Sequence, residues 1–215
     1  MRTWERLRRG LLLPLRFPVL LALSVGYSGL LYMAGLQAGF LDVRNPYWVL
    51  SIGGLLLLSP IYHALLLPAI ASALRGTRVD WRTVVSDAQE LFPRLFLGEV
   101  VVGAAVIVGG LLLFIPGIYV GMRLIYYKQA IVFERRQAIP ALRESLRMTL
   151  DGRSTVGLFL YLAALYGCTA GLDLLLITYA PGLVVHVGSV TGTALLVVWM
   201  NTFVTSSYVA REDGA

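Results

Sequence analysis

Long apolar runs separated by shorter polar segments dominate this chain. Six of them reach or approach the ~20 residues that a helix needs to cross the hydrocarbon layer of a bilayer. They lie at about 17–41, 47–74, 95–114, 117–133, 155–179 and 183–208. The pattern predicts an all-α fold: a polytopic membrane protein with six transmembrane helices in a single membrane domain, 1–215.

Two polar segments between these runs have the period of amphipathic helices. "VDWRTVVSDAQELFPRL" begins with Asp80 as a helix N-cap, and its apolar residues recur at helical spacing. "QAIPALRESLRMTLDGR" has Pro140 near a helix start and places its leucines on one face. We therefore expect interfacial helices at about 80–93 and 139–151. The arginine-rich N-terminus is a third candidate.

Composition supports a membrane protein and excludes other classes. The chain is 58% hydrophobic and only 14% charged, with a mean hydropathy of +0.76, too apolar for a soluble domain of this size. The single cysteine, Cys168, rules out a disulfide framework. The first apolar run is longer than the ~7–15 residues of a cleavable signal segment, so we expect an uncleaved first span.

The basic residues follow a topological rule. Fifteen Lys and Arg residues lie in the N-terminus, the two long connecting segments and the C-terminus, whereas the three short loops together hold one, Arg44. Cytoplasmic loops carry such an excess, so both termini are predicted to be cytoplasmic. The same distribution explains the net charge of +6 without a nucleic-acid partner. The partners expected instead are the lipid bilayer and its anionic phospholipid headgroups.

Four charged residues lie inside predicted spans. Arg123 and Lys128 belong to the fourth, Glu99 to the third and Asp173 to the fifth. At ~1.5 Å per residue, Lys128 and Glu99 are each about 8–9 Å from the cytoplasmic end. Arg123 and Asp173 are each about 9 Å from the outer end. The matched depths predict two intramembrane ion pairs, Arg123–Asp173 and Lys128–Glu99.

Other interpretations of these charges remain open at this point. All four residues lie within about two helical turns of a membrane surface, so each can extend its charged end to the headgroups. Intramembrane charges also mark transport pathways and proton relays. Pairing, extension to the surface and a polar pathway are therefore three alternatives.

His63 lies in the middle of the second predicted span, between Pro60 and Pro68. A proline in a helix frees a backbone carbonyl, which a neutral imidazole can hydrogen-bond. We expect this structural role for His63. Metal binding or proton transfer at a polar midplane position is the alternative.

Motifs of catalysis and of cofactor or metal binding are missing from the sequence. It contains no phosphate-binding loop, no His-Glu-x-x-His and no Cys-x-x-Cys. Neither histidine lies near a hydroxyl in a pattern that indicates a nucleophile–base pair. We therefore expect no catalytic residue, no cofactor and no metal, and hence no enzyme.

The segment "IPGIYVGMRLIYYKQAIVFERRQAIPALRESLRMTLDGRSTVGLFL" resembles the YciC-like family of bacterial inner-membrane proteins. It is also similar to the membrane domain found beside glycerophosphoryl diester phosphodiesterases. The resemblance covers about residues 112–160. The matching residues are Pro116, Gly117, Arg123, Glu134, Ala141, Leu142, Arg143, Ser145, Gly152 and Arg153.

The resemblance implies a multi-span module of a bacterial inner (plasma) membrane, with no catalytic domain of its own. It also marks Lys128 as a departure, because the family stretch is usually apolar there. We expect a non-enzymatic accessory or scaffold protein that contacts anionic lipid, other membrane proteins or a second copy of itself. The alternative is a permease-like subunit or small-solute channel lined by intramembrane charges.

Overall fold

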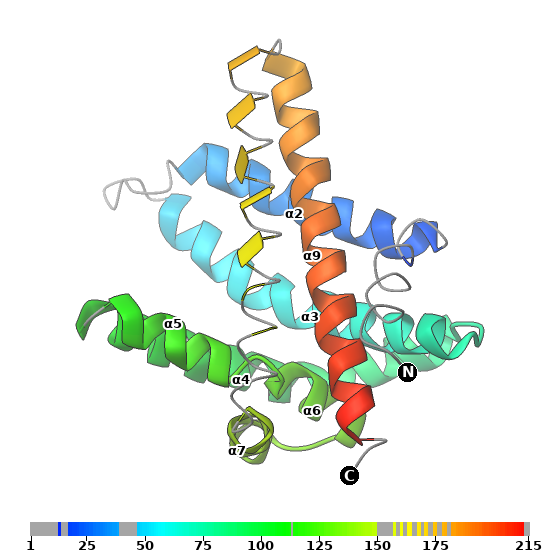
Figure 1. The fold of residues 1–215 in the computed structure, drawn as a ribbon. Helices are drawn as coiled ribbons and strands as arrows, with labels where there is room; N and C mark the ends of the chain where they lie inside the picture. Colours follow the sequence, from blue (N-terminus) through cyan, green and yellow to red (C-terminus); the bar gives the residue numbers. More distant parts are fainter. Residues whose placement is uncertain are drawn as a thin grey trace. The chain divides into compact units, whose positions relative to one another are not determined.

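The computed structural model describes residues 13, 17–38, 47–112, 114–149 and 182–212, with scattered positions between 157 and 179. Within these residues every regular element is an α-helix, as the sequence predicted (Figure 1). The helices are α2 (Pro18–Ala38), α3 (Tyr47–Arg75), α4 (Trp81–Leu112), α5 (Phe114–Arg123), α6 (Tyr127–Glu134), α7 (Ala138–Met148) and α9 (Gly182–Glu212).

Three of the described helices are long and apolar enough to cross a membrane. These stretches are Leu56–Arg75, Trp81–Gly109 and Val184–Val209, and Pro18–Met33 is apolar but shorter. The helical membrane character expected from the sequence is supported to this extent. The number of crossings and their orientation stay predictions, and the fifth predicted span lies largely outside the described residues.

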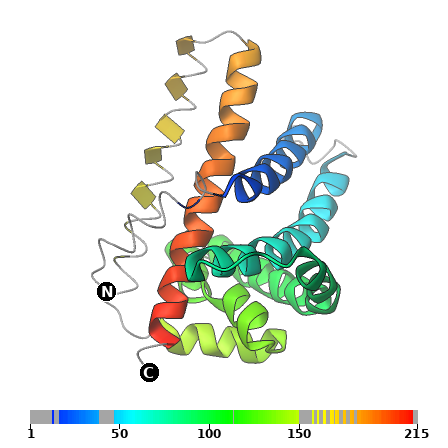
Figure 2. The same ribbon diagram turned by 90° about the vertical axis from the view of Figure 1, so that its right-hand side faces the viewer.

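The chain divides into two compact units. The first comprises residues 1–58 and 161–203, and the second 59–160 and 204–215. Helices α3 and α9 contribute residues to both, and α9 is one uninterrupted helix (Figure 2). The single membrane domain stays a prediction.

In the first unit α2 packs against the N-terminal half of α9. A Cβ atom on Gly29 would lie 3.9 Å from Val190 Cγ1, an ordinary van der Waals contact. One turn further along α2, the Tyr32 hydroxyl forms a hydrogen bond with His186 Nδ1. The contacts join helices that lie more than 150 residues apart in the sequence.

Helix α4 corrects one prediction. The expected surface helix at 80–93 and the expected span at 95–114 form a single helix, Trp81–Leu112, that continues through Pro93. Its buried side chains Val84, Ala88, Leu91 and Leu95 are spaced by four, three and four residues. This stripe keeps its helical register across the proline, so packing on one face offsets the lost backbone hydrogen bond.

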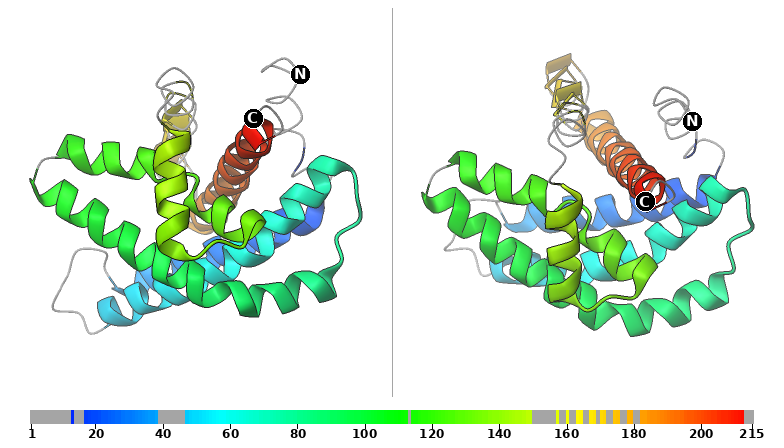
Figure 3. Two further views of the ribbon diagram at one scale, coloured as in Figure 1. Left: turned by 90° about the horizontal axis from the view of Figure 1, so that it is seen from below. Right: turned by 60° about the horizontal axis from the view of Figure 1, so that its bottom comes forward.

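The fourth predicted span is also corrected, because one predicted helix is divided in two. It is two helices, α5 and α6, separated by a three-residue break at 124–126. Both run antiparallel to α4 in one register, because Gly121 lies against Val106 and Gly98 against Tyr127. Helix α5 doubles back along α4 in the views of Figure 3. The break therefore redirects the chain without detaching it from α4.

Helix α7 follows α6 after three residues and crosses the α4–α5 hairpin (Figure 3). Its buried face consists of Ala138, Ala141, Leu142, Glu144 and Ser145. The predicted helix at 139–151 is thus present, but this face packs on protein. Its exposed face carries Ile139, Arg143, Leu146 and Arg147.

Candidate functional site

A buried polar cluster lies in the second unit. Its members are Ser59 and His63 on α3, Glu99 on α4 and Lys128 on α6. Glu99 Oε1 accepts hydrogen bonds from the Ser59 hydroxyl at 2.7 Å and from Lys128 Nζ at 2.9 Å. His63 Nδ1 lies 3.6 Å from the same oxygen. One carboxylate oxygen thus connects three helices.

The antiparallel register of α4 and α6 brings Glu99 to Lys128. The residues before them, Gly98 and Tyr127, are in close contact, and a Cβ atom on Gly98 would lie 2.9 Å from Tyr127 Cε2. A glycine fits here because a Cβ atom would require the Tyr127 and Ile131 side chains, or the helices that carry them, to shift. The side chain of Glu99 is 9% exposed and that of Lys128 is 20% exposed. The structure therefore brings together the two residues that depth matching paired.

The hydrogen bonds of His63 fix its tautomer. Nδ1 lies 2.7 Å from the Ser59 carbonyl oxygen, which can only accept, so Nδ1 carries the hydrogen. In the neutral ring Nε2 is then an acceptor, and Lys128 Nζ lies 3.3 Å from it. The imidazole thus contacts a backbone carbonyl through Nδ1 and an ammonium group through Nε2, and it links α3 to α6.

The expected role of His63 needs one correction. It does bond a carbonyl, but the prolines at 60 and 68 free the carbonyls of Leu56 and Ala64 in the i−4 pattern. The carbonyl that His63 bonds is that of Ser59. The His63 side chain therefore belongs to the polar cluster and does not hydrogen-bond the carbonyl that either proline leaves without a partner.

The cluster is balanced in charge and in hydrogen bonds. The charges of the Lys128 ammonium and the Glu99 carboxylate cancel, and neutral Ser59 and His63 provide further hydrogen-bonding partners. Removing an isolated charge from water costs several kcal/mol, and a paired, hydrogen-bonded charge recovers much of this cost. The arrangement can hold three helices together. Its adjacent nitrogens and oxygens could also pass a proton among themselves.

The second predicted ion pair joins Arg123 to Asp173, and Asp173 lies outside the described residues. The Arg123 guanidinium donates to the Leu146 carbonyl at 3.2 Å and to the Tyr119 hydroxyl at 3.4 Å. It also lies 5.7 Å from the centre of the Tyr119 ring, a cation–π contact. The Arg123–Asp173 pair stays a prediction.

The break between α5 and α6 is closed by hydroxyl groups from α7. Tyr127 N–H donates to the Leu124 carbonyl, which leaves the Arg123 carbonyl without its usual helical partner. The Ser145 hydroxyl donates to that carbonyl at 2.9 Å, and the Thr149 hydroxyl lies 3.1 Å from it, with the Ser145 carbonyl as its other near acceptor at 2.9 Å. Ser145 Oγ also accepts the Tyr126 N–H at 3.0 Å. Side chains of α7 and of its C-cap residue, Thr149, thus replace helix hydrogen bonds inside a predicted span.

The residues of the resemblance motif fall into several environments. Arg123 and Ser145 meet at the break. Ala141 and Leu142 are buried on α7, and Arg143 is exposed. Pro116 and Gly117 lie within α5, and Gly152 and Arg153 lie outside the described residues.

Glu134, the last residue of α6, connects to α9 within the second unit. Its carboxylate accepts hydrogen bonds from the Tyr208 hydroxyl and from Arg136 Nε. Arg136 also lies 3.3 Å from Glu144 on α7. The hydrogen bond and charge of Glu134 raise the pKa of Arg136. The motif residue Glu134 therefore ties three helices at the end of α6.

Arg135 makes a second polar layer with α4. Its guanidinium donates to Asp87 at 2.8 Å and to Glu90 at 3.1 Å, and these acids raise its pKa. Its backbone is left-handed, with φ of 51°, and its carbonyl accepts a hydrogen bond from Arg94 at 2.6 Å. Because these groups are half-exposed, we expect each pair to contribute little alone.

Comparisons with protein-family models, with curated proteins and with solved structures give no match. The resemblance over residues 112–160 therefore stays a prediction that depends on the motif residues. Among the residues that the structure describes, no three His, Cys, Asp or Glu side chains lie close enough to hold a metal ion.

Sequence reasoning missed two members of these networks. Ser59 lies four residues before His63, on the same helix face, and this spacing was a usable signal. Tyr208 lies 74 residues from Glu134, and no local pattern connects them.

Proposed function

We propose that this chain is a non-enzymatic accessory or scaffold protein of the bacterial inner membrane. It crosses the membrane six times, with both termini in the cytoplasm. It offers helix faces and basic cytoplasmic segments to anionic phospholipid and to partner proteins, among them a second copy of itself.

One observation carries this proposal: the charges inside the polar cluster satisfy each other. Lys128 and Glu99 are 2.9 Å apart, the hydroxyl of Ser59 donates to Glu99, and the ring of His63 lies next to Lys128. Charges paired in this way stabilise helix packing. A substrate pathway needs polar groups that remain available to the substrate.

A second candidate function is transport of protons or small ions. The observation that favours it is the position of Lys128, whose partly exposed side chain touches both nitrogens of His63. A chain of titratable groups at membrane depth is a common feature of proton-coupled transporters. In that case Lys128 and His63 would exchange a proton during turnover.

Proteoliposome flux measurements separate the two candidates. The full chain, the variant Lys128→Met and the control Arg143→Gln are reconstituted with a pH-sensitive dye inside, and a pH step is applied. The scaffold proposal predicts that all three behave like protein-free liposomes. Proton flux in the wild type and in Arg143→Gln, abolished by Lys128→Met, would favour transport and overturn the scaffold proposal.

Site-specific photo-crosslinking in native membranes tests the interaction role. A photoreactive amino acid replaces Leu146, which is 40% exposed on α7, or Ala141, which is fully buried on the same helix. The proposal predicts discrete lipid or protein adducts from position 146 and none from position 141. Equal labelling at both positions, or none at 146, would contradict it.

A further inference from the structure

The turn between α3 and α4 is basic and has no charged partner within the described part of the chain. It carries Arg75, Arg78 and Arg82, all exposed, and none of them forms an ion pair or side-chain hydrogen bond with a described residue. Its only acid is Asp80, whose two oxygens accept from the Arg82 N–H at 3.1 Å and the Thr83 hydroxyl at 2.8 Å. These bonds lower the pKa of Asp80, and they show that Asp80 caps α4 and does not pair with an arginine guanidinium of the turn.

The position of this turn is set by the helices on either side. The candidate spans Leu56–Arg75 and Trp81–Gly109 flank it, and only five residues separate them. A short connection between two consecutive spans lies at a membrane surface. Helix α4 has 32 residues and is about 48 Å long, which is longer than a hydrocarbon layer of ~30 Å.

The surface of α4 near this turn is divided into three stripes. One is buried and contains Val84, Ala88 and Leu91. A second carries Asp87 and Glu90, which are paired with Arg135.

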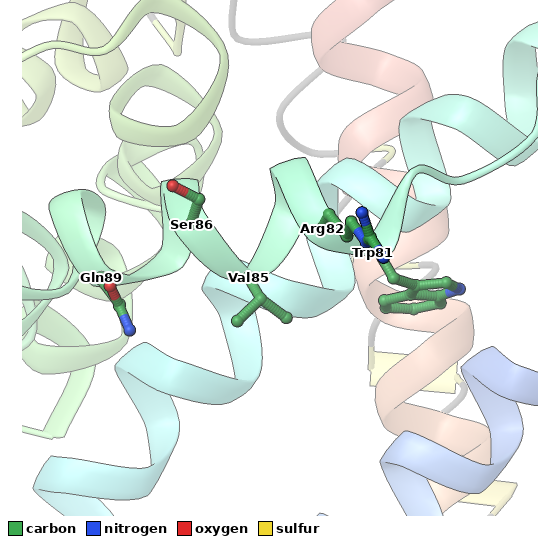
Figure 4. Close-up of a pocket in the computed structure, with 5 residues that line it drawn as sticks. All are labelled: Trp81, Arg82, Val85, Ser86 and Gln89. Atoms are coloured by element: carbon green, nitrogen blue, oxygen red, sulfur yellow. The ribbon is translucent and has the colours of Figure 1, made fainter.

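The third stripe is on the exposed face of the helix and lines an open hollow of about 510 Å³. Figure 4 shows the five side chains around it: Trp81, Arg82, Val85, Ser86 and Gln89. It combines an indole ring, a guanidinium group and the exposed apolar side chain of Val85.

We propose that this hollow and the adjoining arginine turn bind the headgroup of an anionic phospholipid from the surrounding bilayer. The phosphate contacts the guanidinium groups of Arg82, Arg78 and Arg75, since arginine donors match phosphate oxygens in pairs. Trp81 and Val85 contact the glycerol and upper acyl region, where indole rings are favoured. The inference rests on the proposed membrane location and names one lipid class and its site.

The other candidate occupant, an acidic segment of a soluble protein, fits the observations less well. The site combines an indole ring and an apolar side chain with the Arg82 guanidinium, and it lies in the first turns of one candidate span, separated by five residues from the end of another. An acidic peptide would use the charges and leave the indole ring and Val85 without an apolar partner. A phospholipid supplies both the anionic headgroup and the apolar chain.

Quenching of Trp81 fluorescence by brominated lipids measures this binding. Single-tryptophan variants retain Trp81 or Trp199, with the other tryptophans replaced by Phe, in bilayers of phosphatidylcholine and phosphatidylglycerol. At equal mole fraction, brominated phosphatidylglycerol should quench Trp81 more strongly than brominated phosphatidylcholine. Arg82→Gln should lower this lipid preference about fivefold, the equivalent of ~1 kcal/mol per basic residue near an anionic surface. Exposed Arg143 provides the matched control, and Arg143→Gln should leave the preference unchanged.

The outcomes separate this inference from the proposed function. Trp199 lies within the candidate span Val184–Val209, so both brominated lipids should quench it if the chain is a membrane protein. Normal quenching of Trp199 without a phosphatidylglycerol preference at Trp81 would overturn the headgroup site alone. An equal loss of preference in Arg143→Gln would also overturn it, because the effect would then be general surface charge. No quenching of either tryptophan would overturn the membrane proposal itself.

Discussion

Lys128 Nζ on α6 lies 2.9 Å from Glu99 Oε1 on α4, and the two side chains are 20% and 9% exposed. The pair is adjacent in sequence to the close contact between Gly98 and Tyr127. Ser59 and His63 extend it to α3. The ion pair therefore depends on the packing of three helices and in turn fixes their register.

Removing one partner of this pair should destabilise the fold strongly. Glu99→Gln or Lys128→Met leaves an uncompensated buried charge, which costs about 3 kcal/mol or more of unfolding free energy. The double variant should lose less than the two single losses together. Denaturation in mild detergent, followed by circular dichroism, measures these differences. The control Glu90→Gln, in a half-exposed pair, should change stability by less than about 1 kcal/mol. Losses at Glu99 as small as at Glu90 would contradict a buried pair.

The break between α5 and α6 should depend on α7. Ser145→Ala removes the acceptor of the Tyr126 N–H and one of the two hydroxyl groups near the Arg123 carbonyl, so the buried Tyr126 N–H loses this hydrogen bond. We expect a loss of about 1–3 kcal/mol in unfolding free energy, and a further loss on adding Thr149→Val. Ser86→Ala, at an exposed position on α4, is the control. If Ser145→Ala unfolds at the same denaturant concentration as Ser86→Ala, the hydroxyl does not close the break.

Two glycines of α4 should respond in opposite ways to alanine. A Cβ at Gly98 would lie 2.9 Å from Tyr127 Cε2, so Gly98→Ala should destabilise the fold by about 1–3 kcal/mol through overpacking. A Cβ at Gly103 would have no atom within 4 Å among the described neighbours, so Gly103→Ala should stabilise by ~0.5–1 kcal/mol. Thermal denaturation of both variants provides the comparison. A stabilising Gly98→Ala would show that α4 and α6 are further apart than described.

The N-cap of α4 should produce a pH dependence in acid. Hydrogen bonds from Thr83 and Arg82 lower the pKa of Asp80 below its ordinary value of 3.8. Because the pKa is lower in the folded state, the ionised carboxylate stabilises the fold at pH values above the ordinary pKa of 3.8. This stabilisation is lost as the pH falls through the lowered value. Asp80→Asn keeps the cap but does not titrate, so wild type should lose stability relative to it as the pH falls from about 4 through the lowered pKa. Parallel stability curves over this range would show that Asp80 does not act as a charged cap.

The sequence predicted the helical class and one ion pair because both depend on simple distances along a helix. The apolar runs gave helix positions to within a few residues, as in α3 and α9. Counting residues from the predicted cytoplasmic end matched Lys128 with Glu99, since antiparallel helices in register place equal depths together. The same reasoning applies to Arg123 and Asp173, whose pairing stays a prediction.

The sequence misled where side chains from distant segments override local signals. The predicted surface helix ended at residue 93, but the buried stripe of α4 continues past this position. Nothing local marked the break at 124–126, because its stabilising groups, Ser145 and Thr149, belong to another helix. The contact of Tyr208 with Glu134 could not be predicted either, because the two residues belong to different helices 74 residues apart.

A charge exchange within the polar cluster tests the central claim most directly. Stability in detergent is measured for Glu99→Lys, for Lys128→Glu and for the variant that carries both changes. The pairing predicts that each single variant is strongly destabilised by two like charges in contact, and that the exchanged variant recovers most of the lost stability. An exchanged variant no more stable than the weaker single variant would show that Lys128 and Glu99 do not form a pair.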